Sequence, residues 1–284
     1  MRKGLVLNDV SELEGSISYR GPLRMEICGH EVSFDLSNPH EVRYVLRALT
    51  GLPHPQADID HKLFETFVRD GDVCLDIGAN IGMTALEMLS LGAARVIAFE
   101  PVASLADRLR AMAVPSVEVH GIALSDCDGM AEIILSQSHN QGHTLSAEQV
   151  AQFPKVFGDR LRRQTVRTSR LDQVFDNGSA GDLWKIDAEG AEHAVLRGAA
   201  RLLSEEPPRV ILCECYAGVD DLAAILGPDW GGARALLRSD TGALALGPLD
   251  TPGDDRAFRW IAPTYVFYRK DAVALPAGMT FGGV

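Results

Sequence analysis

The sequence lacks several features that would place it outside the soluble globular proteins. It has no apolar run of about 18 residues, the length that a membrane-spanning helix needs. Its first residues lack the apolar segment of a secretory signal peptide. Its five cysteines are odd in number and scattered, without the paired spacing of a zinc site or a disulfide framework. We therefore expect a cytoplasmic protein with reduced thiols, no membrane contact and no bound metal.

Positive charge is also scarce. Lys and Arg total 27 against 39 Asp and Glu, which gives a formal net charge of −12 at pH 7. Such a balance argues against nucleic-acid phosphates as the main partner, because binding them needs a basic surface. The one short basic cluster, within residues 160–170, is typical of a solvated loop or helix face. We expect a small-molecule partner and no nucleic acid, and the sequence is also compatible with a homodimer.

The amino-acid composition is otherwise typical of a folded globular domain. Hydrophobic residues make up 46% and charged residues 23%, close to the averages for folded domains, so a sizeable core is available. The length of 284 residues fits one large α/β domain with a small addition. We predict an N-terminal extension over residues 1–57, formed by a β-hairpin with Gly29 and His30 as its turn and a helix capped by Asn38. This extension is expected to cover a cleft or contact substrate. Residues 58–284 are predicted to form the main domain.

One stretch organises the main domain: Val73-Cys74-Leu75-Asp76-Ile77-Gly78-Ala79-Asn80-Ile81-Gly82-Met83-Thr84. An apolar run ends at Asp76, a glycine-containing turn follows, and a helical pattern begins directly after it. Gly78 and Gly82 allow a sharp turn and a close approach of the backbone to a ligand. The N–H groups at the start of a helix favour a carboxylate or a phosphate. The stretch therefore predicts a strand, a ligand-binding turn and a helix.

The next strand reduces the number of ligands that this turn could bind, because the strand ends at Glu100-Pro101. An acid at this distance from the turn, about 20 residues, can bind both hydroxyls of an adenosine ribose. A dinucleotide site would need a third glycine, which the turn does not have. An ordinary strand, turn and helix with an acid placed by chance is the alternative interpretation.

Strands and helices alternate through the rest of the domain, which predicts βαβ units and a parallel sheet. The turn after the third strand contains Ser125 and Asp126, which would face the same edge of the sheet as Glu100. Residues 138–146 are polar and contain glycine, so we predict a loop that acts either as a lid or as a plain solvated connection. Near the C-terminus we predict a helix at residues 232–237 and a strand at residues 242–249.

A second chemical stretch is Lys185-Ile186-Asp187-Ala188-Glu189-Gly190-Ala191-Glu192. It again consists of a strand, an acid at its carboxyl end, a glycine and a helix. Lys185 and Asp187 lie on the same face of the strand and can pair. Acids gathered in a cleft can accept a proton from a substrate or bind a cation. We predict function for Asp187 and Glu189, and we interpret Glu192 as an acid of the first helical turn, favoured by the helix dipole.

Together these stretches resemble the FkbM family of S-adenosylmethionine-dependent methyltransferases. The similarity also includes Ala123-Leu124-Ser125-Asp126 and the helix residues Val195-Leu196-Arg197-Gly198-Ala199, and it covers about residues 60–216. Two positions depart from the family pattern: Ala188 stands where Val is common, and Tyr216 stands where a His is expected. The resemblance implies a Rossmann-like class I methyltransferase, with a mostly parallel seven-stranded sheet, helices on both faces and an antiparallel last strand.

The resemblance also implies S-adenosylmethionine as cofactor and methylation of hydroxyls on sugars or other specialised metabolites. The residues expected to bind the cofactor are Asp76, Gly78, Ala79, Asn80, Gly82, Thr84, Glu100, Pro101, Ser125 and Asp187. Direct displacement needs alignment and removal of a proton, so the expected catalytic residues are Asp187, Glu189 and His193, with Glu189 ahead of His193 as base. The alternatives are N-methylation of an amine or peptide, a nicotinamide-dependent oxidoreductase, and a non-catalytic scaffold.

Overall fold

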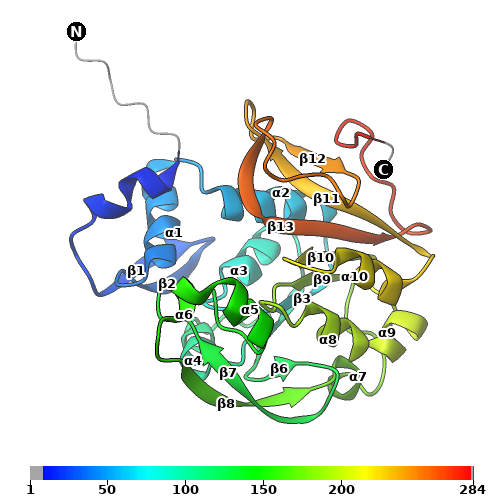
Figure 1. Cartoon of the computed structure of the whole chain (residues 1–284), viewed down its shortest axis with the longest axis horizontal. Helices are drawn as coiled ribbons and strands as arrows, with labels where there is room; N and C mark the ends of the chain where they lie inside the picture. Colours follow the sequence, from blue (N-terminus) through cyan, green and yellow to red (C-terminus); the bar gives the residue numbers. More distant parts are fainter. Residues whose placement is uncertain (1–8, 283) are drawn as a thin grey trace.

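The computed structural model describes residues 9–282 and 284, and its centre is one mixed sheet of eight strands (Figure 1). The strand order is β12-β11-β13-β10-β9-β3-β4-β5. These strands are β3 (Val73–Ile77), β4 (Arg95–Phe99), β5 (Val117–His120), β9 (Leu183–Ile186), β10 (Val210–Glu214), β11 (Trp230–Arg238), β12 (Leu244–Gly247) and β13 (Phe258–Arg269).

The strand directions confirm a mostly parallel Rossmann-like sheet. β5, β4, β3, β9 and β10 pair in parallel, whereas β13 lies antiparallel between β10 and β11. The chain leaves β3 toward β4 and β5 and later returns to β9 on the other side of β3, so the order reverses between β3 and β9. In open α/β sheets, ligands bind at the carboxyl ends of the strands beside such a reversal.

Two predictions about this sheet are wrong. The sheet has eight strands and not seven, because residues 230–238 form the additional strand β11 between β13 and β12, the latter of which lies within the strand predicted at residues 242–249. The helix predicted at residues 232–237 lies within β11. Ala, Leu and Arg favour helices intrinsically, but pairing with β12 on one side and β13 on the other decides the conformation of this segment.

Helices cover both faces of the sheet, as predicted. One face packs against α2 (Pro55–Phe67) and α3 (Met83–Ser90), and the other packs against α8 (Glu192–Arg197), α9 (Ala200–Glu205) and α10 (Val219–Leu226). Two further helices of this domain are α4 (Ala103–Ala111) and α7 (Leu171–Val174). Within β3, Cys74 faces the α2 and α3 side and Leu75 faces the other, both fully buried. No helix among the described residues has the length and apolarity to cross a bilayer.

The N-terminal extension consists of η1 (Val10–Ser16), the hairpin β1 (Pro22–Ile27) and β2 (His30–Asp35), and helix α1 (Pro39–Thr50). The predicted hairpin forms, but its two turn residues are Cys28 and Gly29 and not the predicted Gly29 and His30, because His30 already belongs to β2. Cys28 and Gly29 both have positive φ, 50° and 78°, which a tight hairpin turn of this kind needs. The predicted Asn38 cap also forms, and Gly51 ends α1 in the left-handed conformation. The predicted division after residue 57 falls inside α2.

A small second sheet lies beside the main one, at the lower edge of Figure 1. Its strands are β6 (Ala123–Leu124), β7 (Gly129–Leu135) and β8 (Arg162–Ser169). Residues 138–146 form the predicted irregular loop between β7 and β8. Two short helices then follow that the sequence did not indicate, α5 (Ala147–Gln152) and α6 (Pro154–Phe157).

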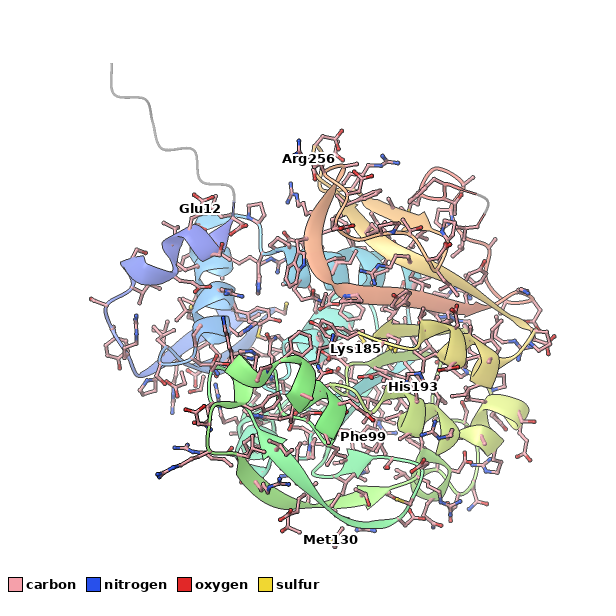
Figure 2. All side chains as sticks on the ribbon, in the orientation of Figure 1. Glu12, Phe99, Met130, Lys185, His193 and Arg256 are labelled. Carbon is pink, nitrogen blue, oxygen red and sulfur yellow. The ribbon has the colours of Figure 1, made fainter. Side chains whose placement is uncertain are left out.

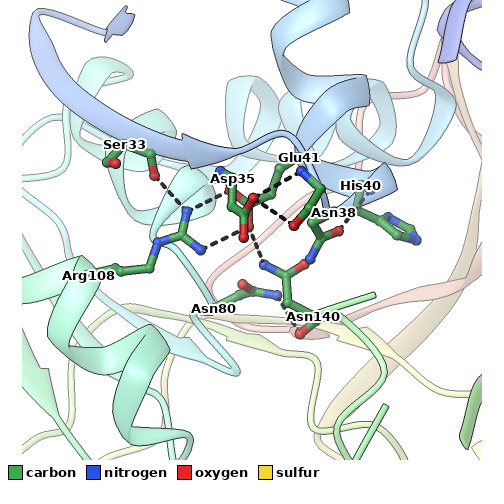
Figure 3. Close-up of polar contacts among 9 residues, drawn as sticks. Ser33, Asp35, Asn38, His40, Glu41, Asn80, Arg108 and Asn140 are labelled. Carbon is green, nitrogen blue, oxygen red and sulfur yellow. Dashed lines mark hydrogen bonds and ion pairs between the residues drawn. The ribbon is translucent and has the colours of Figure 1, made fainter. Parts of the chain in front are cut away.

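Glu41 of α1 joins the extension, α4 and this loop in one polar network (Figure 3). Its carboxylate accepts two hydrogen bonds from Arg108, at 2.6 and 2.9 Å, and one from the backbone N–H of Asp35 at 2.6 Å. The side-chain amide of Asn140 donates to the same carboxylate at 3.0 Å. Asn80 in turn donates to the backbone carbonyl of Asn140 at 3.0 Å. The network therefore links the extension to the turn that follows β3.

Replacing Glu41 by Gln should lower the free energy of unfolding by about 1–3 kcal/mol, because Arg108 loses the partner of a largely buried ion pair. Urea denaturation of both proteins measures the difference. The control is Glu31→Gln, since the pair of Glu31 with Arg24 is exposed and should contribute less than about 1 kcal/mol. Equal losses in the two variants would contradict a structural role for the Glu41 network.

Candidate functional site

A cavity of about 830 Å³ lies where the carboxyl ends of β3, β4, β9 and β10 meet the extension. The sheet edge contributes Gly78, Ala79, Asn80, Thr84, Glu100, Pro101, Lys185, Asp187, Glu189, Glu214 and Tyr216. The extension and α2 contribute His40, Glu41, Arg43, Tyr44, His54, Gln56 and Asp60, and the loop contributes His139, Asn140, Gln141, His143 and Leu145. The cavity therefore lies at the point where the strand order reverses.

The turn after β3 packs directly against the end of β9. Gly78 has a φ of +84°, and a Cβ there would lie 1.9 Å from the backbone oxygen of Asp187. Asn80 also has a positive φ, 51°, and Gly82, with φ +84°, precedes the first residue of α3. Only glycine fits at Gly78, because the clash would be with backbone that cannot turn aside. This close contact brings the two acidic strand ends to one cavity.

Two buried oxygen atoms of this turn have no hydrogen-bond partner among the described residues. Asp76 is fully buried; one of its oxygens accepts from the hydroxyl of Thr84 at 2.6 Å, and the other, Oδ1, is unpaired. The Oδ1 of Asn80 is also unpaired. Buried polar atoms are nearly always hydrogen-bonded, so these two oxygens fit a ligand that donates hydrogen bonds.

Glu100 is a buried carboxylate at the end of β4, with 5% of its surface exposed. Its two oxygens each accept one backbone N–H, from Asn80 at 2.9 Å and from Val102 at 2.8 Å. Burial raises the pKa of Glu100 to about 7, although these hydrogen bonds oppose the shift. Each oxygen keeps a free lone pair, so the carboxylate can still accept hydrogen bonds from two ligand hydroxyls.

At the end of β9, Lys185 and Asp187 form an ion pair of 3.1 Å, as the sequence predicts. Lys185 is buried near the centre of the molecule (Figure 2). Burial alone would lower its pKa, but the charges of Asp187, Asp76 and Asp60 outweigh burial and raise it. Lys185 is therefore a permanent cation among acids.

Glu189 is the strained acid of the site. Its φ is +49°, a conformation that non-glycine residues rarely adopt and that is concentrated at functional sites. Gln149 of α5 donates to its carboxylate at 3.0 Å, and the Thr144 hydroxyl donates to its backbone carbonyl. Burial, followed by the charge of Asp187, raises the pKa of Glu189 well above its ordinary value. The loop and α5 thus hold Glu189 as a proton acceptor of high affinity.

Glu192 and His193, which follow Glu189 in the sequence, do not line the cavity. Glu192 is in the first turn of α8, as interpreted, and accepts the backbone N–H groups of Ala188 at 3.1 Å and Gly190 at 2.9 Å. His193 contacts the carbonyl of Gly218 at 2.9 Å through Nε2. Ligand atoms of Glu192, His193 and Cys215 lie within 4.8 Å of one another, a grouping that could hold a metal ion. Glu192 and His193 nevertheless already bond to backbone groups, which a metal ion would have to replace.

The structure gathers most of the predicted site residues and leaves four outside the cavity lining. Those that line it are Gly78, Ala79, Asn80, Thr84, Glu100, Pro101, Asp187 and Glu189. Asp76 is buried and bonded to Thr84, Gly82 is the N-cap residue of α3, and His193 contacts Gly218. Ser125 donates its backbone N–H to Ser169 in the small sheet, while its neighbours Ala123 and Leu124 line the cavity.

Several lining residues were missed, mainly on the extension and α2. His40 and His54 read as surface or loop residues in the sequence, but His54 is 5% exposed and lines the cavity. The rings of His40 and His139 lie 4.3 Å apart, which joins α1 to the loop. Asp60 and Gln56 carry no local signal, because ordinary helix positions become site residues only through the packing of α2. Tyr216, where the pattern led us to expect a His, lines the cavity.

Gly78→Ala should destabilise the chain by about 3 kcal/mol or more, because the new Cβ would overlap the backbone of Asp187. Gly71→Ala is the matched control, since Gly71 has a φ of +89° but no described atom lies within 4 Å of the position that a Cβ would take there. It should cost only the strain of the left-handed conformation, about 1 kcal/mol. Urea unfolding compares the two, and similar costs would refute the close approach of the turn to β9.

Comparison with known proteins agrees with this geometry. The profile of the methyltransferase FkbM domain matches residues 76–239, more than half of the chain. AMB antimetabolite synthetase AmbE of Pseudomonas aeruginosa is 37% identical over 175 residues, which are 47% of this chain and 8% of that protein. The chain thus spans a small part of the curated relative that it matches.

Solved structures resemble the chain only distantly. A precorrin-6Y C5,15-methyltransferase from Geobacter metallireducens has a TM-score of 0.39 and 13% identity, with 74% of this chain and 86% of that chain covered. A SAM-dependent methyltransferase from Agrobacterium tumefaciens has a TM-score of 0.41 and 8% identity, with coverages of 90% and 72%. The assignment rests on the profile match, which includes both acidic strand ends of the cavity: the chain belongs to the FkbM methyltransferase family.

Proposed function

We propose that the chain transfers a methyl group from S-adenosylmethionine to a hydroxyl of a small molecule, such as a sugar or another specialised metabolite. The observation that carries this proposal is the shared cavity. Glu100 and the turn that follows β3 line this cavity together with Asp187 and Glu189. The site for the methyl donor therefore lies next to a proton acceptor. Family membership supports methyl transfer. The choice of oxygen as the target is part of the proposal.

The residues around the β3 turn fit this cofactor. Its ammonium group is a hydrogen-bond donor, and the unpaired buried oxygens of Asp76 and Asn80 are acceptors in need of a donor. Ala79 and Thr84 complete the wall beside Gly78 and Gly82 at this methionine end. Glu100, beside Pro101, offers a carboxylate to the two ribose hydroxyls. Ser125 would approach the adenine through the turn that it shares with Leu124.

The bound cofactor supplies a methyl group on a sulfonium, which is already a good leaving group. The protein therefore has to align the acceptor hydroxyl and remove its proton. Glu189 is the proposed base, because it lines the cavity and its raised pKa makes its carboxylate a stronger proton acceptor than an exposed one. Asp187 is bound to Lys185 and is better suited to positioning. His193 does not line the cavity, which makes it the weaker candidate.

Titration calorimetry with S-adenosylmethionine and with NAD tests the proposal. We expect binding of the first and not of the second; the reverse would favour an oxidoreductase, and binding of neither would favour a scaffold. Glu100→Gln should weaken S-adenosylmethionine binding about 10–100-fold, because two charge-assisted hydrogen bonds to the ribose are lost. An unchanged dissociation constant in this variant would refute the ribose assignment.

Glu189→Gln should lower the turnover number at least about 100-fold and change the dissociation constant of S-adenosylmethionine less than about twofold. Any acceptor that the wild-type chain methylates serves for the measurement. Because the base acts when deprotonated and its pKa is raised, the wild-type rate should fall as pH is lowered through that raised pKa, and the variant should lose this dependence. Glu148→Gln, an exposed acid on α5, is the control. Equal losses of turnover and cofactor binding would count against a base.

A further inference from the structure

Asp60 and Glu214 form an acidic wall of the cavity that the proposed mechanism does not use. Asp60 lies one turn after Gln56 on α2, so the two side chains share a face of the helix. The Gln56 amide donates to Glu214 at 3.0 Å, and its oxygen accepts the backbone N–H of Ala262 at 2.9 Å. Gln56 is thus fixed at both ends, and it holds the face of α2 that carries Asp60 against Glu214 at the end of β10, on which Asp60 acts electrostatically.

Neither carboxylate of this wall has a cation within ion-pair distance among the described residues, although Lys185 acts on both at longer range and Arg234 acts on Glu214. Lys185 is within ion-pair distance of Asp187 alone, and Arg43, which also lines the cavity, pairs with Glu14. The remaining contacts of Glu214 are neutral donors, the Gln56 amide and the Tyr216 hydroxyl.

Burial of this wall carries an electrostatic cost. Burial raises the pKa of Asp60 to about 7, and burial together with Asp187, Glu189 and Asp60 raises that of Glu214 well above its ordinary value. The charge of Lys185 opposes both shifts but does not cancel them. Partly buried carboxylates that lack a cation at contact distance are costly, and a cationic ligand would reduce that cost.

His54 gives an independent indication that a ligand binds at this side of the cavity. It is 5% exposed and lines the cavity, and its Nδ1 has no hydrogen-bond partner among the described residues. Burial lowers the pKa of His54 to about 4, so the ring is neutral at physiological pH. Its ring packs edge-on against Tyr44 at 5.1 Å, and Asp60 acts electrostatically on that same tyrosine. An unpaired nitrogen in this position suits a polar group of the acceptor.

The donor supplies no lasting countercharge to this wall in the proposed arrangement. Its ammonium lies at Asp76 and Asn80, and its sulfonium becomes a neutral thioether when the methyl group is transferred. We propose that the methyl acceptor carries a protonated amine, which binds between Asp60 and Glu214 while its hydroxyl lies against Glu189. This inference rests on the proposed methyl transfer and narrows its acceptor to amino alcohols and amino sugars.

The ammonium group binds the acceptor to the wall but is not methylated, because a protonated amine has no lone pair with which to attack the methyl carbon. In the reaction, the hydroxyl oxygen forms a bond to the methyl carbon and the carbon–sulfur bond breaks. The bonding pair stays on sulfur, and the hydroxyl proton passes to the Glu189 carboxylate. The products are the methyl ether and S-adenosylhomocysteine.

Calorimetry on the chain saturated with S-adenosylhomocysteine tests the ammonium site with matched probes. The pairs are glucosamine and glucose, ethanolamine and ethylene glycol, and 1,4-diaminobutane and 1,4-butanediol. We expect the amine to bind at least about tenfold more tightly than its alcohol in one pair or more. Asp60→Asn and Glu214→Gln should each reduce this preference at least about fivefold. Asp254→Asn, which removes an exposed acid before β13, should leave it unchanged.

Equal binding of amine and alcohol in every pair, or no binding in any pair, would overturn the ammonium site. So would a preference that survives in both variants, each of which is checked for folding by circular dichroism. The dissociation constant of S-adenosylhomocysteine, measured first, reports separately on the proposed function. If the chain preferred amines but did not bind S-adenosylhomocysteine, the result would support the ammonium site and contradict the proposed methyl transfer.

Discussion

The site depends on one buried cation, the ammonium of Lys185, which lies where β3, β9, β10 and α2 converge. Four acids, Asp187, Asp76, Asp60 and Glu214, act on it electrostatically, and only Asp187 lies at ion-pair distance. Without this charge, the acidic strand ends would repel one another in a medium that screens them poorly. Lys185 therefore allows a sheet edge rich in carboxylates to close into a single cavity.

Much of the fold could be predicted because its signals are local. The stretch from Asp76 to Gly82 contains a strand end, a turn and a helix start within a few residues, and each is decided by its neighbours in sequence. The hairpin and the Asn38 cap are of the same kind, although the hairpin turn lies one residue earlier than predicted, at Cys28 and Gly29. The helix predicted at residues 232–237 failed because β12 and β13, which pair with this segment, come later in the chain.

The candidate site could be predicted only in part, for a related reason. Acids at strand ends, such as Glu100 and Glu189, reach the cavity because parallel strands end at one edge. Asp60 and His54 come from α2 and the turn before it, and nothing near them in sequence shows that this helix packs beside β10. His193 follows a predicted acid stretch closely, yet the first turn of α8 carries it toward Gly218.

The contacts of the loop after β7 have a kinetic consequence. Asn140 touches the turn after β3, and Thr144 of the same loop holds the backbone of Glu189 in its left-handed conformation. A movement that opened this loop would disturb both places together. Methyl transfer would then occur only while the loop is closed. Product release and substrate binding would need the loop to open, so loop closure would limit the turnover number whenever it is slower than methyl transfer.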